Sequence, residues 1–274
     1  SYLAMDDCSS AVKYYQQLVK RQRIDELSEE QLASMQREKL AGLVDETALE
    51  LAAKAEIRTA TCYGKIGDYE AGVASFRRVI TRFASERKLV EEAYLRLADM
   101  YEQRGDFDES VRTYREAIDI SSDRSLRARI QFALAEKLFS KGAYADALSE
   151  FRVYLQGYGD IARNVGFSTD RVHYRMGNSY QQLAQVRLER GEQAAAVPHL
   201  KRAVAYYDTI LQLSNTPYKW ESRFNRAYAL QSMGDVTSGD LAERAYQTLV
   251  EEASESYVQR SLLQLSELSF ERGD

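Results

Sequence analysis

Residues 94–118 read YLRLADMYEQRGDFDESVRTYREAI, and this stretch decides the fold. On each side of Gly105, apolar residues recur at the i, i+3, i+4, i+7 spacing that defines one face of an α-helix. The glycine between them supplies a turn conformation that other residues adopt only with strain. The stretch therefore predicts two α-helices joined by a tight turn. The two faces comprise Tyr94, Leu97, Ala98 and Tyr101, then Phe107, Ser110, Val111, Tyr114, Ala117 and Ile118.

The same helix–glycine–helix arrangement recurs along the chain. Successive turn glycines lie 38, 37, 49, 43 and 39 residues apart, and five of the six precede an acidic residue. A repeat of this length predicts a solenoid, because each helix pair can bury its apolar face only against its neighbours. The six glycines are Gly67, Gly105, Gly142, Gly191, Gly234 and Gly273.

Composition limits the function classes. The chain has 274 residues, of which 45% are hydrophobic and 29% charged, as is typical of folded globular proteins. Its net charge of −5 argues against a nucleic-acid-binding protein, which needs a clustered basic face, although it leaves room for a local basic patch. No apolar run approaches the roughly 18–20 residues of a membrane span. We expect neither nucleic-acid binding nor membrane insertion.

No arrangement of residues indicates an enzyme, a metal site or a cofactor. His173 and His199 have no partner at a ligand spacing. The segment 157–159 lacks the following glycine and lysine of a phosphate-binding loop. Cys8 and Cys62 are expected to be small buried residues, and a disulfide between them requires that the first helices bring them together. We predict a protein with no catalytic residues and no cofactor.

The repeat resembles the tetratricopeptide repeat (TPR) family, most closely over 53–156 and less closely over 170–274. Ala84 and Ser122 replace the family's closing proline, and the spacing exceeds the usual 34 residues. The resemblance implies an all-α, right-handed superhelix of antiparallel helix pairs, a TPR-like α-solenoid of about 11–13 helices. The second unit carries the match through Tyr94, Ala98, Tyr101, Phe107, Ser110, Tyr114 and Ala117.

The longer spacing and the second helices rich in tyrosine and phenylalanine resemble bacterial envelope-associated TPR proteins more than co-chaperones. This resemblance implies a bacterial protein of the periplasm or cytoplasm, with the periplasm slightly favoured. Both ends of the chain interrupt the repeat, so we expect a fragment of a larger protein. We divide one continuous solenoid into a partial repeat and extra helix over 1–52, regular repeats over 53–156, repeats with insertions over 157–250, and a truncated terminal repeat over 251–274.

Residues 156–168 predict a loop, and seven more residues than usual separate Tyr180 from Gly191. Because seven residues are about two helical turns, the helix before Gly191 can lengthen and keep its face. Two interpretations remain open for the insertion. It is either a protrusion that contacts a partner or a tolerated surface insertion.

Other features interrupt the pattern. Pro198 fits in a second helix that begins near 194 or 195, where its missing N–H lies in the first turn; otherwise the helix kinks. Asn215-Thr216-Pro217 predicts a helix cap followed by a first-turn proline. The polar residues 235–240 predict a widened turn between helices. Near the start, Ser28 and Gln31 match a capping box before a long helix or helix pair over 29–65.

The family resemblance places the binding surface at non-core positions of the first helices, on the concave side. Phe132 and Phe139 share a helix face, and Leu95 continues it in the neighbouring repeat. We predict a shallow apolar groove with a charged rim that holds an extended or helical segment of a partner protein. The alternative is that both phenylalanines pack against an adjacent helix. The predicted contacts are Leu95, Asp99, Arg129, Phe132, Glu136 and Phe139, with Ile57, Thr61 and Glu102 at equivalent positions.

These observations favour a non-enzymatic scaffold for protein–protein interaction. One alternative is a regulatory domain that senses a peptide or small ligand. Another is a structural module that associates with itself through its terminal helices, since Leu262, Leu265 and Phe270 form an apolar face with no second helix to cover it.

Overall fold

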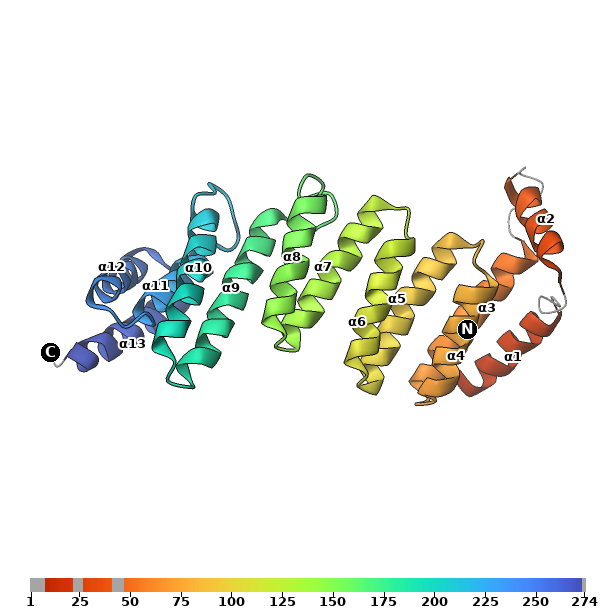
Figure 1. Ribbon diagram of the computed structural model, residues 1–274, viewed down its shortest axis with the longest axis horizontal. Helices are drawn as coiled ribbons and strands as arrows, with labels where there is room; N and C mark the ends of the chain where they lie inside the picture. Colours follow the sequence, from red (N-terminus) through yellow and green to blue (C-terminus); the bar gives the residue numbers. More distant parts are fainter. Residues whose placement is uncertain (1–7, 22–26, 41–46, 273–274) are drawn as a thin grey trace. The chain divides into compact units, whose positions relative to one another are not determined.

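The computed structural model describes residues 8–21, 27–40 and 47–272, and this part of the chain contains thirteen α-helices and no strand (Figure 1). The all-α, TPR-like solenoid is confirmed, and the helix count lies within the expected range. The helices are α1 Cys8–Arg21, α2 Glu29–Leu40, α3 Ala48–Lys65, α4 Tyr69–Arg82, α5 Arg87–Arg104, α6 Phe107–Ile120, α7 Arg124–Ser140, α8 Tyr144–Tyr158, α9 Thr169–Leu188, α10 Gln193–Leu211, α11 Lys219–Gln231, α12 Val236–Glu252 and α13 Glu255–Arg272.

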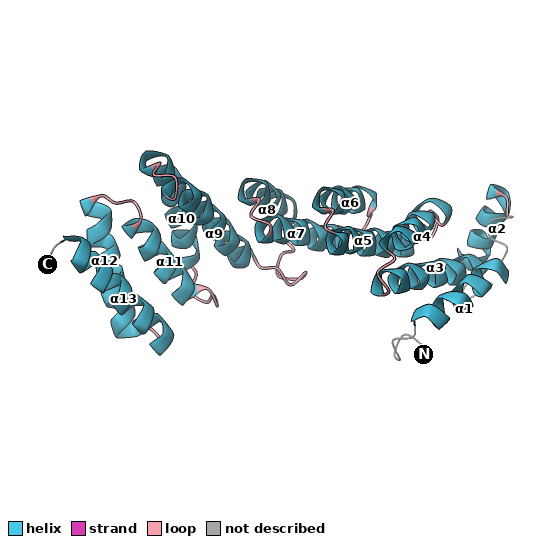
Figure 2. Ribbon diagram, turned by 90° about the horizontal axis from the view of Figure 1, so that it is seen from below, coloured by secondary structure: helices cyan, strands magenta, loops and turns pink. Residues whose placement is uncertain are grey.

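The chain forms two compact units, Ser1–Ile130 and Gln131–Asp274, and the boundary lies within α7. In the first unit α1 packs on α3, and each of α3, α4 and α5 packs on the helix that follows it. Figure 2 shows α3 and α5 in one layer and α4 and α6 in the other. In the second unit α8 to α13 likewise pack in chain order.

The turn glycines behave as predicted. All five that lie among the described residues have positive φ angles, from 71° at Gly191 to 93° at Gly105; Gly273 lies outside the described residues. At Gly105 the left-handed conformation ends α5, and the N–H of Asp106 reaches back to the carbonyl of Tyr101 at 2.8 Å. This bond satisfies a carbonyl that the end of the helix would otherwise leave without a partner.

Small residues let the helices approach each other closely. Ala60, Ala98 and Ala227 are fully buried on first helices. Gly177 occupies the same kind of position on α9, where a Cβ atom would lie 2.7 Å from the ring of Tyr207. A side chain there would have to displace a buried aromatic ring, so the packing of α9 on α10 depends on glycine.

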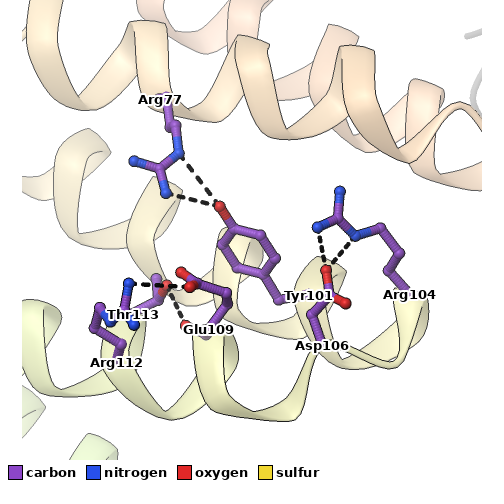
Figure 3. Close-up of polar contacts among 7 residues, drawn as sticks. All are labelled: Arg77, Tyr101, Arg104, Asp106, Glu109, Arg112 and Thr113. Carbon is purple, nitrogen blue, oxygen red and sulfur yellow. Dashed lines mark hydrogen bonds and ion pairs between the residues drawn. The ribbon is translucent and has the colours of Figure 1, made fainter.

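Polar contacts connect successive helices in the first unit (Figure 3). Arg77 of α4 donates to the hydroxyl of Tyr101 on α5 at 2.8 Å. Arg104 and Asp106 form an ion pair on either side of the turn glycine. These contacts join the second helix of one repeat to the first helix of the next and hold the turn between α5 and α6.

The expectation for the insertion at 156–168 is wrong in part. α8 continues to Tyr158, so the helix extends into the predicted loop. The following segment folds back over α8, where Ala162 and Val165 are buried and the hydroxyl of Tyr154 donates to the carbonyl of Phe167 at 2.8 Å. Both interpretations placed this segment at the surface; Asp160, Arg163 and Asn164 are indeed exposed, but Ala162 and Val165 belong to the core. The lengthening of the next helix is confirmed, because α9 has 20 residues.

The polar segment 235–240 does not widen a turn. α12 begins at Val236, and the carboxylate of Asp235 caps it by accepting from the backbone N–H of Ser238 at 3.0 Å. Gly239 and Ala242 of this segment's helix are buried. The prediction is wrong because a short capping residue started the helix earlier than the apolar pattern indicated.

Both proline predictions need correction. α10 begins at Gln193, so Pro198 lies beyond the first turn, and the helix nevertheless continues through it to Leu211. Pro217 precedes α11, which begins at Lys219, and the hydroxyl of Thr216 accepts from the backbone N–H of Tyr218.

Near the start, the predicted helix pair is confirmed as α2 and α3. The capping box is also confirmed: the Ser28 N–H donates to Gln31 Oε1 at 2.8 Å, and the Gln31 N–H donates to Ser28 Oγ at 3.3 Å. Gly42 and Asp45, two residues typical of a helix bend or end, lie outside the described residues.

Replacing Gly177 with alanine should lower the free energy of unfolding by about 1–3 kcal/mol, because the new methyl group overlaps the buried ring of Tyr207. Gly64→Ala provides the matched control. Its methyl group would meet the flexible end of Met100, which can move, so we expect a change within about 1 kcal/mol. Urea unfolding of both variants measures the difference, and equal effects would contradict the packing argument.

Candidate protein-binding surface

Three adjoining hollows lie on the first helices of the first unit. The largest, about 550 Å³, lies between α5 and the start of α7. The second and third, about 240 Å³ and 230 Å³, lie between α3 and α5. Glu92 lines the first and second hollows, and Thr61 and Arg96 line the second and third, so the three are continuous. We call this surface the first-helix groove.

The groove residues come from repeated positions on successive helices. The largest hollow is lined by Arg87, Lys88, Glu91, Glu92, Leu95, Ser122, Asp123, Ser125, Leu126 and Arg129. The other two are lined by Lys54, Ile57, Arg58, Thr61, Gly64, Lys65, Phe76, Leu89, Glu92, Arg96, Asp99, Met100 and Gln103.

Three of the six predicted contact residues lie in this groove. Leu95 and Arg129 line the same hollow, and Asp99 lines the third. Ile57 and Thr61, the equivalent positions on α3, line the second. Of the positions predicted on α3, α5 and the start of α7, all but Glu102 thus lie on one hollowed surface.

Phe132 does not lie on an open surface, and its assignment to the groove is corrected. Only 2% of its surface is exposed. Its ring stacks on Phe167 with centroids 4.2 Å apart and contacts the rings of Phe151 and Tyr154 edge-on at 5.9 and 5.6 Å. The guanidinium of Arg171 lies 4.9 Å from the ring centroid. All of these contacts lie in the second unit, so Phe132 is a core residue that the insertion covers.

Glu136 and Phe139 are half-buried and are both held by Arg175 of α9. The Nε of Arg175 donates to Glu136 Oε1 at 2.7 Å, and its guanidinium lies 5.1 Å from the centroid of Phe139. The ring of Tyr144 packs edge-on against Phe139 at 5.4 Å. The open stripe predicted from Phe132 and Phe139 therefore does not form, because α9 and the insertion occupy that side of α7.

Several charged side chains of the first-helix groove already have partners within the protein. Arg96 pairs with Glu92 at 2.8 Å, and Lys54 with Glu50 at 3.0 Å. Asp99 accepts a hydrogen bond of 2.8 Å from the hydroxyl of Tyr114. Burial raises the pKa of Tyr114, and the neighbouring carboxylate raises it further, so the hydroxyl remains the donor.

Positive charges dominate among the groove side chains that remain unpaired. Arg58, Arg87, Lys88 and Arg129 are exposed and make no hydrogen bond or ion pair with any residue that the structure describes. Among the groove carboxylates that the structure describes, Glu91 alone makes no hydrogen bond or ion pair, and unlike these cations it is buried. The groove therefore presents a basic surface, although the whole chain carries a net charge of −5.

Apart from Arg129, the basic residues of the groove were not predicted from the sequence, although a signal for some of them exists. Lys54, Arg58 and Lys65 lie with Thr61 at i, i+4, i+7 and i+11, which is one stripe of α3. Arg87 and Lys88 carry no such signal, because only the packing of α5 beside α7 brings them to the largest hollow.

The described ranges contain no group of three or more histidine, cysteine, aspartate or glutamate residues that could hold a metal ion. Among the helices from α1 to α13, none is long and apolar enough to cross a membrane.

Comparison with known proteins identifies the repeats. Two family models described as tetratricopeptide repeat match residues 54–85 and 89–159, so these segments are TPR repeats. Such repeats generally mediate protein–protein interactions and are typically non-catalytic. A comparison with curated proteins found no match.

Similar solved structures include BtubC (BKLC) from P. vanneervenii, with 17% identity, a TM-score of 0.40, and coverage of 88% of this chain and 92% of that one. The C-terminal part of a TPR repeat-containing protein from Cytophaga hutchinsonii has 16% identity, a TM-score of 0.46, and coverage of 88% and 78%. The TPR domain of P58(IPK) has 17% identity, a TM-score of 0.37, and coverage of 99% and 81%.

Phe132→Ala should lower the free energy of unfolding by about 3–5 kcal/mol, because it removes a buried ring from an aromatic cluster. Phe139→Ala should lower the free energy of unfolding by about half as much or less, since that ring is half-buried. Urea unfolding monitored by circular dichroism compares the two. A stable Phe132→Ala variant would show that the ring does not support the core.

Proposed function

We propose that this chain, which carries TPR repeats over 54–85 and 89–159, binds an extended segment of a partner protein along its first-helix groove and acts as a non-enzymatic scaffold. The observation that carries the proposal is the continuity of the three hollows across α3, α5 and the start of α7. The proposal includes the bacterial envelope setting implied by the long repeat spacing.

The groove is formed by helices rather than by loops, which favours binding. The side chains that line it project from α3, α5 and α7, and the helix backbones are fixed by buried residues such as Leu97 and Ala98. A preformed surface loses little conformational freedom on binding, so more of the contact energy appears as affinity.

The charges of the groove favour an acidic partner segment. Arg58, Arg87, Lys88 and Arg129 have no partner within the described part of the chain. A segment in which acidic residues alternate with apolar ones would satisfy these cations and place apolar side chains against Ile57 and the half-buried Leu95.

Fluorescence anisotropy with defined peptides tests this function. The probe is a fluorescein-labelled peptide in which glutamate alternates with leucine over about twelve residues, which spans roughly 40 Å when extended. We expect it to bind and to bind less tightly as salt is added, because salt screens exposed charges. The variant Arg58→Glu/Arg129→Glu should weaken binding about tenfold or more, equivalent to about 1.4 kcal/mol or more.

Lys201→Glu, an exposed charge reversal on α10 of the second unit, is the matched control and should leave binding unchanged. Peptides with glutamine or lysine in place of glutamate separate the two parts of the proposal. Equal binding of all three peptides would exclude the charge preference. Equally tight binding to the unmodified protein and to the Arg58→Glu/Arg129→Glu variant would exclude the groove as the binding site.

A second candidate function is self-association through α13. Leu262, Leu263 and Phe270 expose 51%, 58% and 86% of their surfaces, while Leu265 packs partly against the core of the second unit. A second copy of the chain presents the same apolar face, so a symmetric contact between two α13 helices would bury both.

Sedimentation velocity over a range of protein concentrations tests this candidate. We expect the sedimentation coefficient to rise with concentration, and Leu262→Glu/Phe270→Glu to abolish the rise. The control Leu213→Glu alters an exposed apolar residue outside α13 and should leave it unchanged. A concentration-independent profile for the unmodified protein would exclude the candidate.

A further inference from the structure

The only two cysteines of the chain lie in one small core cluster. Cys8 is the first residue of α1 and Cys62 lies on α3; they expose 2% and 0% of their surfaces. Ala11 and Val12 complete the buried part of the cluster, and Tyr63 packs against it. The helix packing therefore meets the requirement for a disulfide, because it brings residues 54 positions apart in sequence to the same place.

The two thiols influence each other's ionisation within this cluster. Burial raises the pKa of Cys62 to about 12, and a hydrogen bond with the Cys8 side chain adds to the shift, so this thiol is protonated at neutral pH. Both cysteines are free thiols here, which means that the structure represents the reduced pair.

We propose that Cys8 and Cys62 form a disulfide that fixes α1 on α3. A disulfide needs Cβ atoms about 3.5–4.5 Å apart and a sulfur–sulfur bond of about 2.05 Å. Cys8 and Cys62 lie in one small buried cluster between two helices that pack against each other, which favours this geometry, and Ala11 and Val12 beside them are small and apolar.

The oxidant is a low-molecular-weight disulfide such as oxidised glutathione. One cysteine thiolate attacks it, forms a mixed disulfide and releases one equivalent of reduced thiol. The second cysteine then attacks the protein sulfur of the mixed disulfide and releases the second equivalent. The two cysteines lose two electrons and two protons in total, and the oxidant gains them.

The position of α1 explains how the oxidant gains access. α1 lies at the edge of the first unit and packs mainly against α3, and its exposed Gln16 donates to the hydroxyl of Tyr63 at 2.9 Å. An edge helix opens more readily than one enclosed by neighbours on both sides. Opening of α1 exposes both thiols, whereas the disulfide would prevent that opening by closing a loop through the first helices.

The experiment treats the intact chain with oxidised glutathione, with and without a urea concentration below the unfolding transition. The protein is then denatured, alkylated with iodoacetamide and weighed by mass spectrometry. We expect a monomer that has lost two hydrogens and accepts no alkyl group, while the reduced protein accepts two. The oxidised monomer should melt several degrees higher, and dithiothreitol should reverse the shift.

Cys8→Ser and Cys62→Ser are the matched controls, and neither should gain thermal stability on oxidation. The proposal is wrong if both thiols stay alkylatable even in urea, if each forms only a glutathione adduct, or if oxidation yields cross-linked dimers. An oxidised monomer with an unchanged melting temperature would show that the bond does not hold α1.

Discussion

The close approach of neighbouring helices at small residues is the constraint on which the rest of this structure depends. Where α9 meets α10, Gly177 leaves room for the ring of Tyr207, and Ala98 and Ala227 have the same role on other first helices. A single helix pair cannot bury its own apolar face, so stability comes from contacts between successive pairs. The turn glycines allow these contacts, because each one ends a helix abruptly and lets the next helix run back in the opposite direction.

Local features of the fold were predictable from the sequence, and features that depend on distant residues were not. The helix faces on either side of Gly105 and the capping box at Ser28 require only neighbours in sequence. The burial of the insertion was not predictable, because its partner, Phe132, lies about 30 residues away in the sequence. No local pattern indicates that Phe167 stacks on this ring. Pro198 lies slightly further into α10 than expected, because the helix begins at Gln193, and the helix continues through it.

The hollowed surface of the first helices was predictable in its position but not in its character. The resemblance to TPR repeats indicated a candidate surface on these helices, and Leu95, Asp99 and Arg129 lie in hollows there. The apolar character expected from Phe132 and Phe139 is absent, because other parts of the second unit cover these rings. The basic character depends on which charges find internal partners, and helical spacing alone does not determine that.

The folded-back insertion has a consequence for how the length of this chain can vary. Loops between repeats usually tolerate added or deleted residues, because their backbones face water. Residues 159–168 are different, since Ala162 and Val165 are buried and the carbonyl of Phe167 is fixed by Tyr154. A deletion there would expose an aromatic cluster to water. Among related sequences, this segment should therefore keep its length, while the turns between other helices gain or lose residues.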